Sequence, residues 1–273
     1  MDLISSRANP KIKQVRLLKG RPARQAQKTP GLVVVEGLHP VGEAVAAAQA
    51  GKLALDSIIY SPELLKSDFG LALVRSQTAA GLPCYPVTRQ VFESVADKEN
   101  PQGILAVARP TLYSLEGLSP DNFPWGVALV APQDPGNVGT ILRTIDAVGA
   151  SGLFLLDSSV DPYHSSAVRA SMGALFWYPL VRASFDDFAR WAAQGGYTVY
   201  GTSAHAATDY RVFKAYQRPL ILLLGSERQG LSAGQAAICH HMLRLPMHGR
   251  GSSLNLAVAA GVMLYAMLEE RDN

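Results

Sequence analysis

The feature that most constrains the fold is a set of six short apolar runs in the second half of the chain. The runs are GVALVAP, GLFLLD, YPLVR, GYTVYGTS, LILLLG and MLRLP, and each is followed by helix-like or turn-like sequence. Short apolar runs that alternate with helices indicate a parallel sheet covered on both faces. Ligands of such sheets bind beyond the carboxyl ends of the strands, so a site is expected in the segments that follow these runs.

The first 108 residues predict a separate, smaller α/β domain. ANPKIKQVRLLKG begins a helix well, because Asn9 can cap it, Pro10 suits the first helical position and Gly20 can end it. Further strands are expected at LVVVEG, LDSIIY, PCYPV and GILAVA, and helices at Pro40 to Ala50, Phe69 to Ala80 and Thr88 to Ala96. Residues 109–123 are proline-containing and aperiodic, which predicts a linker to a second domain at 124–273.

The charge of the chain is concentrated at its start. Residues 1–30 hold eight Lys and Arg against Asp2 alone, whereas residues 111–273 hold eleven basic and thirteen acidic groups. A basic arm on a nearly neutral body is typical of a nucleic-acid-binding protein, although a solvated basic helix is the alternative. The candidate nucleic-acid contacts in this arm are Arg7, Lys11, Lys13, Arg16, Arg21 and Arg24.

The last apolar stretch, Leu256 to Leu268, raises the question of a membrane. It has 13 residues, fewer than the roughly 20 that a bilayer requires, so we expect no membrane span. Because it is apolar on every side, we expect a helix buried on every side, which can also pack against a second subunit.

Cys84 and Cys239 are far apart and match no metal spacing, so a reducing cytoplasm is expected.

Four segments carry polar groups at expected strand ends. In APQDPGNVGTILRTIDAVGA, Asp134 can cap a helix on which Arg143 follows Gly139 by one turn, as in a phosphate site. In LILLLGSERQGLS, Glu227 can bind a hydroxyl or cation, or cap the next helix. LRLPMHGRGSSLN offers glycines for a close backbone approach, followed by hydrogen-bonding side chains, and VYGTSA is a fourth strand end.

Other motifs in the sequence do not have the neighbouring residues or strands that their usual chemistry requires. GLSAG matches the G-x-S-x-G of serine hydrolases, but Ser232 comes eight residues after Leu224 instead of directly after a strand. The adjacent Cys239, His240 and His241 point in different directions on a helix, so a metal site is not expected. The phosphate loop of NTPases and a strand-linked G-x-G-x-x-G are both missing from the sequence.

Taken together, NVGTILRT, LLLGSERQGLS and LRLPMHGRGSSLNLAVAAGVMLY resemble, in order and spacing, the three motifs of the TrmH/SpoU RNA ribose 2′-O-methyltransferases of the SPOUT superfamily. VVVEGLHPVGEAV and PQGILAVA resemble the family's N-terminal substrate-binding domain, which is related to kink-turn-binding ribosomal proteins. The resemblance implies a trefoil knot in the parallel-sheet domain, a homodimer, and S-adenosylmethionine held mainly by backbone groups.

The resemblance also implies roles for individual positions. It places Arg143 closest to the ribose hydroxyl, with Asn137, Glu227, Ser253 and Asn255 around it. The positions that match the family's cofactor site are Thr202, Ser203, Leu224, Gly225, Leu245, Met247 and Leu254. Ser226 and Arg228 depart from the Asn and Gly of many members, and Arg228 is a further candidate RNA contact.

These observations predict an S-adenosylmethionine-dependent RNA ribose 2′-O-methyltransferase of the cytoplasm. A separate N-terminal domain favours ribosomal RNA over tRNA, because the family's tRNA-specific members usually carry short extensions. The alternatives are a tRNA methyltransferase and a non-catalytic RNA-binding or ribosome-assembly factor that keeps the fold.

Overall fold

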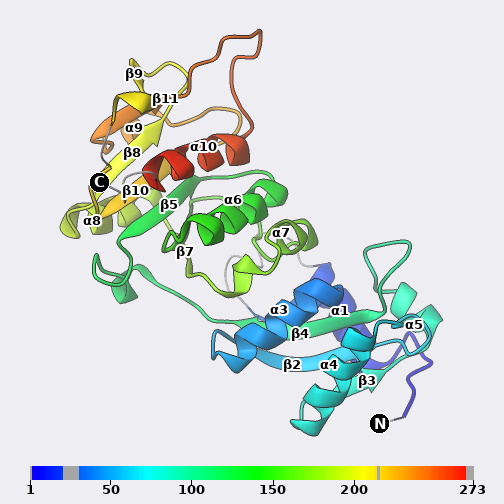
Figure 1. Ribbon diagram of the computed structural model, residues 1–273. Coiled ribbons are helices and arrows are strands. Elements are labelled where there is room, and N and C mark those ends of the chain that lie inside the picture. The colour runs from blue at the N-terminus through cyan, green and yellow to red at the C-terminus, as the bar shows by residue number, and fades with distance from the viewer. Residues whose placement is uncertain (1, 21–30, 214–215, 269–273) are drawn as a thin grey trace. The chain divides into compact units, whose positions relative to one another are not determined.

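A computed structural model describes residues 2–20, 31–213 and 216–268 (Figure 1). The chain forms two compact units. Unit 1 comprises Met1–Thr111 and Asp161–Trp177, and unit 2 comprises Leu112–Val160 and Tyr178–Asn273. Among the described residues, no helix is long and apolar enough to cross a membrane.

Unit 1 is built on a mixed four-stranded sheet in the order β1-β4-β2-β3. β4 runs antiparallel to both β1 and β2, and β2 is parallel to β3. The strands are β1 (Val33–Glu36), β2 (Leu53–Tyr60), β3 (Cys84–Pro86) and β4 (Ile104–Pro110), and the helices before β4 are α1 (Pro10–Lys19), α3 (Leu38–Gln49), α4 (Asp68–Ala79) and α5 (Arg89–Glu93). Every strand and helix expected here is present, although the helix expected to reach residue 96 ends earlier.

The caps of α1 follow the sequence signals. Asn9 accepts a hydrogen bond from the Lys11 N–H at 2.9 Å, Pro10 is the first helical residue, and Gly20 donates to the Arg16 carbonyl. Ile12 and Val15, on the inner side of α1, are fully buried against Val91 and Phe92 of α5 and Leu105 of β4. This places the outer side of α1 in water.

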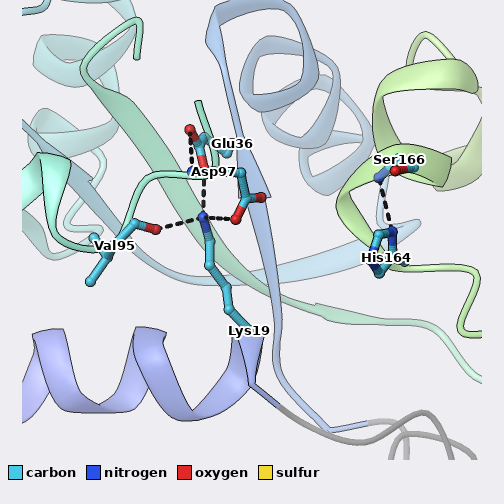
Figure 2. Close-up of polar contacts among 6 residues, drawn as sticks. All are labelled: Lys19, Glu36, Val95, Asp97, His164 and Ser166. Carbon is cyan, nitrogen blue, oxygen red and sulfur yellow. Dashed lines mark hydrogen bonds and ion pairs between the residues drawn. The ribbon is translucent and has the colours of Figure 1, made fainter. Parts of the chain in front are cut away.

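The other end of α1 is held by a partly buried ion cluster around Lys19 (Figure 2). Its Nζ lies 2.5 Å from Glu36 Oε2 and 3.1 Å from Asp97 Oδ1, and it donates a hydrogen bond to the Val95 carbonyl at 2.7 Å. The Asp97 N–H donates to the Glu36 carboxylate as well. One ammonium group thus joins α1, β1 and the segment after α5.

Asp161–Trp177 packs with unit 1 although it lies between two strands of unit 2 in the chain. His164 Nδ1 accepts a hydrogen bond from the Ser166 N–H and so caps α7 (Ser165–Ala170), as Figure 2 shows. Trp177 Nε1 donates to Glu43 of α3 at 3.1 Å, and His39 lies 3.2 Å from the Met172 carbonyl. The chain therefore passes between the units three times, and the segment 109–123 is one of three connections.

Unit 2 is built on a seven-stranded sheet in the order β7-β6-β5-β10-β8-β11-β9, and every neighbouring pair is parallel. The strands are β5 (Trp125–Val130), β6 (Gly152–Leu156), β7 (Leu180–Ala183), β8 (Thr198–Thr202), β9 (Thr208–Asp209), β10 (Leu220–Leu224) and β11 (His241–Arg244). The expected parallel sheet is confirmed. The two-residue β9 carried no sequence signal.

Helices cover both faces of this sheet (Figure 1). On one face, Phe188 and Ala192 of α8 (Phe185–Gln194) pack with alternate strand residues such as Ala128, Phe154 and Ile221. α6 (Pro135–Val148) and α10 (Leu256–Leu268) pack against each other and against strands of the sheet. Strand residues buried on both faces explain why the runs in the sequence are continuously apolar.

Helix α10 has the expected bounds, but the expectation that it is buried on every side is wrong for the single chain. Val258 and Tyr265 are each 51% exposed, whereas Ala260, Met263 and Leu264 are fully buried. The exposed pair lies seven positions apart, which places both on one side of the helix. An apolar strip of α10 therefore faces outward.

The Lys19 cluster gives a prediction about stability. Replacing Lys19 with Met leaves Glu36 and Asp97 facing each other without a cation, which we expect to lower the free energy of unfolding by about 2–4 kcal/mol. The control is Lys13→Met on the exposed side of α1, with an expected change within about 0.5 kcal/mol. Urea unfolding of the full chain measures both, and equal midpoints would show that the cluster does not stabilise unit 1.

Candidate active site

Helix α6 begins directly beyond the carboxyl end of β5. Asp134 accepts a hydrogen bond from the Gly136 N–H at 2.7 Å, and Pro135 takes the first helical position, where an N–H is not required. The expected cap at Asp134 is confirmed. This turn places Asn137 on the inner side of α6, where it is 7% exposed.

Glu227, three residues beyond β10, joins α6 to the loop before α10. Asn137 Nδ2 donates to Glu227 Oε1 at 3.1 Å, and the backbone N–H groups of Gln133 and Asp134 donate to the same carboxylate at 3.1 and 3.3 Å. Asn255 Nδ2 donates to Asn137 Oδ1 at 3.0 Å. The three motif segments therefore share one hydrogen-bond network.

Asn255 also fixes the start of α10. Its Oδ1 accepts hydrogen bonds from the Ala257 and Val258 N–H groups at 2.9 and 3.3 Å. One amide thus caps the helix with its oxygen and orients Asn137 with its nitrogen. Asn255, which the resemblance places in the third motif, therefore has a structural role, because the helix cap uses its side-chain oxygen and the contact with Asn137 uses its side-chain nitrogen.

The protonation state of Glu227 follows from its neighbours. Burial raises its pKa, but the hydrogen bonds from Asn137 and from the Gln133 and Asp134 backbone outweigh burial, so the pKa lies below the usual 4.5. At neutral pH the group is a carboxylate whose oxygens accept three hydrogen bonds. Glu227 does not cap the following helix, because Ser232 caps α9 (Ala233–Ala236) with a capping box.

A cavity of about 660 Å³ lies at the carboxyl ends of β8, β10 and β11. Its volume is in the range of small-molecule sites. All seven positions that match the family's cofactor site line it: Thr202, Ser203, Leu224, Gly225, Leu245, Met247 and Leu254. Glu227, Arg228, Ser253 and Asn255 line it as well, so most of the candidate site is brought together.

Arg143 lies apart from this cavity. Neither it nor Asn137 is a lining residue, and Arg143 is exposed on α6, where its side chain has no hydrogen bond or ion pair with another described residue. Its neighbour Thr144 borders a second groove, of about 490 Å³, together with Tyr210 and with Gly261 and Tyr265 of α10. The structure brings Asn137, Glu227 and Asn255 into contact, but not Arg143.

The loop after β10 requires glycine at its entry. A Cβ on Gly225 would lie 2.0 Å from the Gly230 carbonyl carbon and 2.3 Å from the Leu231 nitrogen. The Gly230 N–H donates to the Ser226 carbonyl at 2.9 Å, and the Gln229 N–H donates to Ser226 Oγ at 3.3 Å. The departure at Ser226 therefore supplies a hydroxyl that closes the loop.

The hydrolase and metal alternatives find no support. Ser232 is the cap of α9, as described above. His240 Nδ1 accepts a hydrogen bond from the Val199 N–H, and His241 stacks on Tyr200. Burial raises the pKa of Cys239 to about 11, which keeps its thiol protonated. No group of metal-ligating side chains occurs among the described residues.

The candidate RNA contacts of the basic arm differ in whether their side chains interact with other groups of the chain. Lys11 lies 3.9 Å from Asp56 and 5.4 Å from the Tyr85 ring centre. Arg7, Lys13 and Arg16 are exposed and have no ion pair within the described chain. Arg21 and Arg24 lie outside the described residues.

Sequence reasoning missed several participants. The backbone N–H groups of Gln133 and Asp134 bind Glu227, and a backbone group leaves no trace in residue type. His205, Gln229 and Leu231 also line the cavity. A signal existed for His205, because it closely follows the end of β8.

Comparison with known proteins matches both parts of the chain. The SpoU rRNA Methylase family matches residues 124–265, and the MRM3-like substrate binding domain matches residues 9–106. The 23S rRNA (guanosine(2553)-2′-O)-methyltransferase RlmP of Bacillus subtilis is 29% identical over 97% of this chain and 98% of its own. The 23S rRNA (uridine(2479)-2′-O)-methyltransferase of Streptomyces viridochromogenes is 30% identical over 98% of this chain and 92% of its own.

A solved structure extends the likeness to three dimensions. The crystal structure of an AdoMet-bound rRNA methyltransferase from Sinorhizobium meliloti has a TM-score of 0.86 at 31% identity. It covers 100% of this chain and 99% of its own. The likeness therefore includes both units.

The Glu227 network predicts a pH dependence of stability. Because its folded-state pKa is below 4.5, its stabilising contribution is full above that pH and is lost as the pH falls through the folded-state value. We expect Glu227→Gln to be less stable than the wild type at pH 7, with the difference shrinking below about pH 4.5. Chemical unfolding across this range measures it, with exposed Glu99→Gln as control; a difference constant with pH would contradict the prediction.

Proposed function

Because the chain belongs to the SpoU rRNA methylase family, and is therefore an S-adenosylmethionine-dependent RNA ribose 2′-O-methyltransferase of the SPOUT fold, we propose that its substrate is a nucleotide of ribosomal RNA. The observation that carries the choice of rRNA is that two relatives with full-length similarity are 23S rRNA methyltransferases. The match of residues 9–106 to a substrate-binding domain agrees with it, and the Glu227–Asn137–Asn255 network beside the cavity supports the site of the reaction. A tRNA substrate is the alternative.

The cavity suits S-adenosylmethionine in size and in chemistry. Leu224 at the end of β10, Leu245 just past β11 and Leu254 before α10 offer apolar side chains for the adenosine, and main-chain groups of these loops can bind the base edge. Thr202 and Ser203 add hydroxyls at the end of β8. We therefore assign the cofactor to this cavity and the residues Thr202, Ser203, Leu224, Gly225, Leu245, Met247 and Leu254 to its binding.

Bound S-adenosylmethionine supplies an electrophilic methyl group, and the residues around it position the ribose. We assign the catalytic site to Arg143, Asn137, Glu227, Ser253 and Asn255. Holding the 2′ oxygen in line with the methyl group supplies much of the rate. A guanidinium stays charged, so Arg143 acts by binding the phosphate beside the target ribose and stabilising negative charge on the 2′ oxygen, not as a base.

The remaining expectations are part of the same proposal. A homodimer is supported by the outward apolar strip of α10, with Val258 and Tyr265 half exposed. A trefoil knot is supported by the loops after β8, β10 and β11 meeting at one cavity. The cytoplasm is supported by the free thiols of Cys84 and Cys239, which suit a reducing compartment.

The test is transfer of radiolabelled methyl groups from S-adenosylmethionine to separate pools of unmodified rRNA and tRNA. We expect label in rRNA with the wild type. With Arg143→Ala we expect a loss of at least about 100-fold in transfer, because the phosphate contact and charge stabilisation are removed, while cofactor binding stays the same. Arg190→Ala on α8 is the matched control, with full activity expected.

Each other result has a defined meaning. Label in tRNA alone would select the alternative substrate, and a fully active Arg143→Ala would remove Arg143 from the mechanism. Absence of both label and cofactor binding would favour the non-catalytic RNA-binding factor. Ribose modification is confirmed by resistance of the labelled nucleotide to alkaline cleavage on its 3′ side.

The exposed charges of α1 give a separate prediction about RNA binding. If Lys13 and Arg16 contact phosphates, the double variant Lys13→Gln/Arg16→Gln lowers the slope of log affinity against log salt by about 1.4–1.8 in magnitude. The exposed pair Lys52→Gln/Lys66→Gln on the same unit is the charge-matched control. Filter binding of rRNA across a salt series measures the slopes, and equal slopes would make the arm a solvated helix.

A further inference from the structure

The inference concerns Arg228, and it rests on the proposed function. Arg228 lies in the loop Ser226–Gly230, between β10 and α9, and lines the cavity. It is exposed, and none of the described residues forms an ion pair or hydrogen bond with it. A long cationic side chain thus stands at the cavity with its charge unpaired.

The loop keeps its shape without help from Arg228. Backbone and hydroxyl hydrogen bonds from Gly230 and Gln229 to Ser226 close it, and the absence of a Cβ on Gly225 lets Gly230 pack at its base. Gly230 has a positive φ of 66° that completes the turn. A structural role for the Arg228 side chain therefore has no contact to support it.

The neighbouring acid is not available to Arg228. Glu227 directs its carboxylate at Asn137 and at the Gln133 and Asp134 backbone N–H groups, and no ion pair joins it to Arg228 among the described residues. Apart from Glu227 and Arg228, the residues that line the cavity carry no Lys, Arg, Asp or Glu. The guanidinium is therefore left to an anion that comes from outside the chain.

The chemistry of the reaction identifies that anion. The target 2′-hydroxyl is on the carbon next to the one that carries the 3′-phosphate, so the RNA backbone must pass the cavity when the ribose enters. The following loop, between β11 and α10, adds His248 and Arg250 and no acid, and both are exposed. A planar guanidinium binds a phosphate with two parallel hydrogen bonds, which neither a glycine nor a lysine can supply.

We propose that Arg228 binds a backbone phosphate of the substrate RNA at the entrance to the cavity, and is a determinant of RNA affinity. Arg143 and Arg228 then contact the RNA from two different elements, α6 and the Ser226–Gly230 loop.

The experiment compares wild type, Arg228→Gln, Arg228→Lys and the control Arg190→Gln on α8, whose side chain is 69% exposed. Binding of unmodified rRNA transcripts is measured across a salt series, and binding of S-adenosylmethionine by calorimetry. We expect Arg228→Gln to weaken RNA binding about tenfold and to reduce the salt slope by about 0.7–0.9. Arg228→Lys keeps the slope but recovers part of the affinity, and Arg190→Gln resembles the wild type.

Three results would overturn the inference. An RNA affinity and slope equal to the wild type would show that Arg228 does not touch the backbone. Weaker S-adenosylmethionine binding with an unchanged RNA slope would assign the guanidinium to the cofactor's carboxylate. A lowered unfolding midpoint in both Arg228 variants would make its role structural. The proposed function fails separately, when the wild type itself neither binds nor methylates RNA.

Discussion

One carboxylate holds together the three segments of the candidate active site. Glu227 accepts hydrogen bonds from Asn137 and from two backbone N–H groups before α6, and Asn137 in turn accepts from Asn255 at the start of α10. These partners come from residues 90 or more positions apart. Removing the carboxylate leaves the amide donor of the buried Asn137 without an acceptor, which costs more than the hydrogen bond contributes on average. The site therefore depends on an acid whose role is to accept hydrogen bonds.

The sheet makes this network possible. In a parallel sheet the carboxyl ends of all strands lie at one edge. The loops that follow β8, β10 and β11 therefore come together there, and no long connecting segment is needed. Gly225 lets the Ser226–Gly230 loop fold back against the end of β10, closer than any side chain would permit. The cavity is lined in part by apolar residues at strand ends, such as Leu224 and Leu245. Apolar residues of this kind are also typical of a protein core, so residue type alone does not reveal a cavity here.

What the sequence could predict was local. The caps at Asn9 and Asp134, the apolar strands and the bounds of α10 follow from neighbouring residues, and they are confirmed. The Lys19 cluster joins residues 76 positions apart, so no local pattern indicates it. The half-exposed Val258 and Tyr265 were missed because an all-apolar helix carries no periodicity to mark its outer side. The gathering of Glu227, Ser253 and Asn255 was expected from a resemblance to a family, and not from periodicity.

The charges of the chain divide into two classes with different physical roles. Lys19, Glu227 and Asp209 are engaged by the fold, and hydrogen bonds to Arg211 hold the pKa of Asp209 at about 2. Within the described chain, Lys13, Arg143 and Arg228 have no such partner. Ions that the fold pairs are weakly screened when buried, whereas exposed cations attract a polyanion in a salt-dependent way. We therefore expect added salt to weaken RNA binding while the hydrogen-bonded site stays assembled. Salt then changes the affinity for the substrate and does not change the geometry that is proposed to orient the ribose.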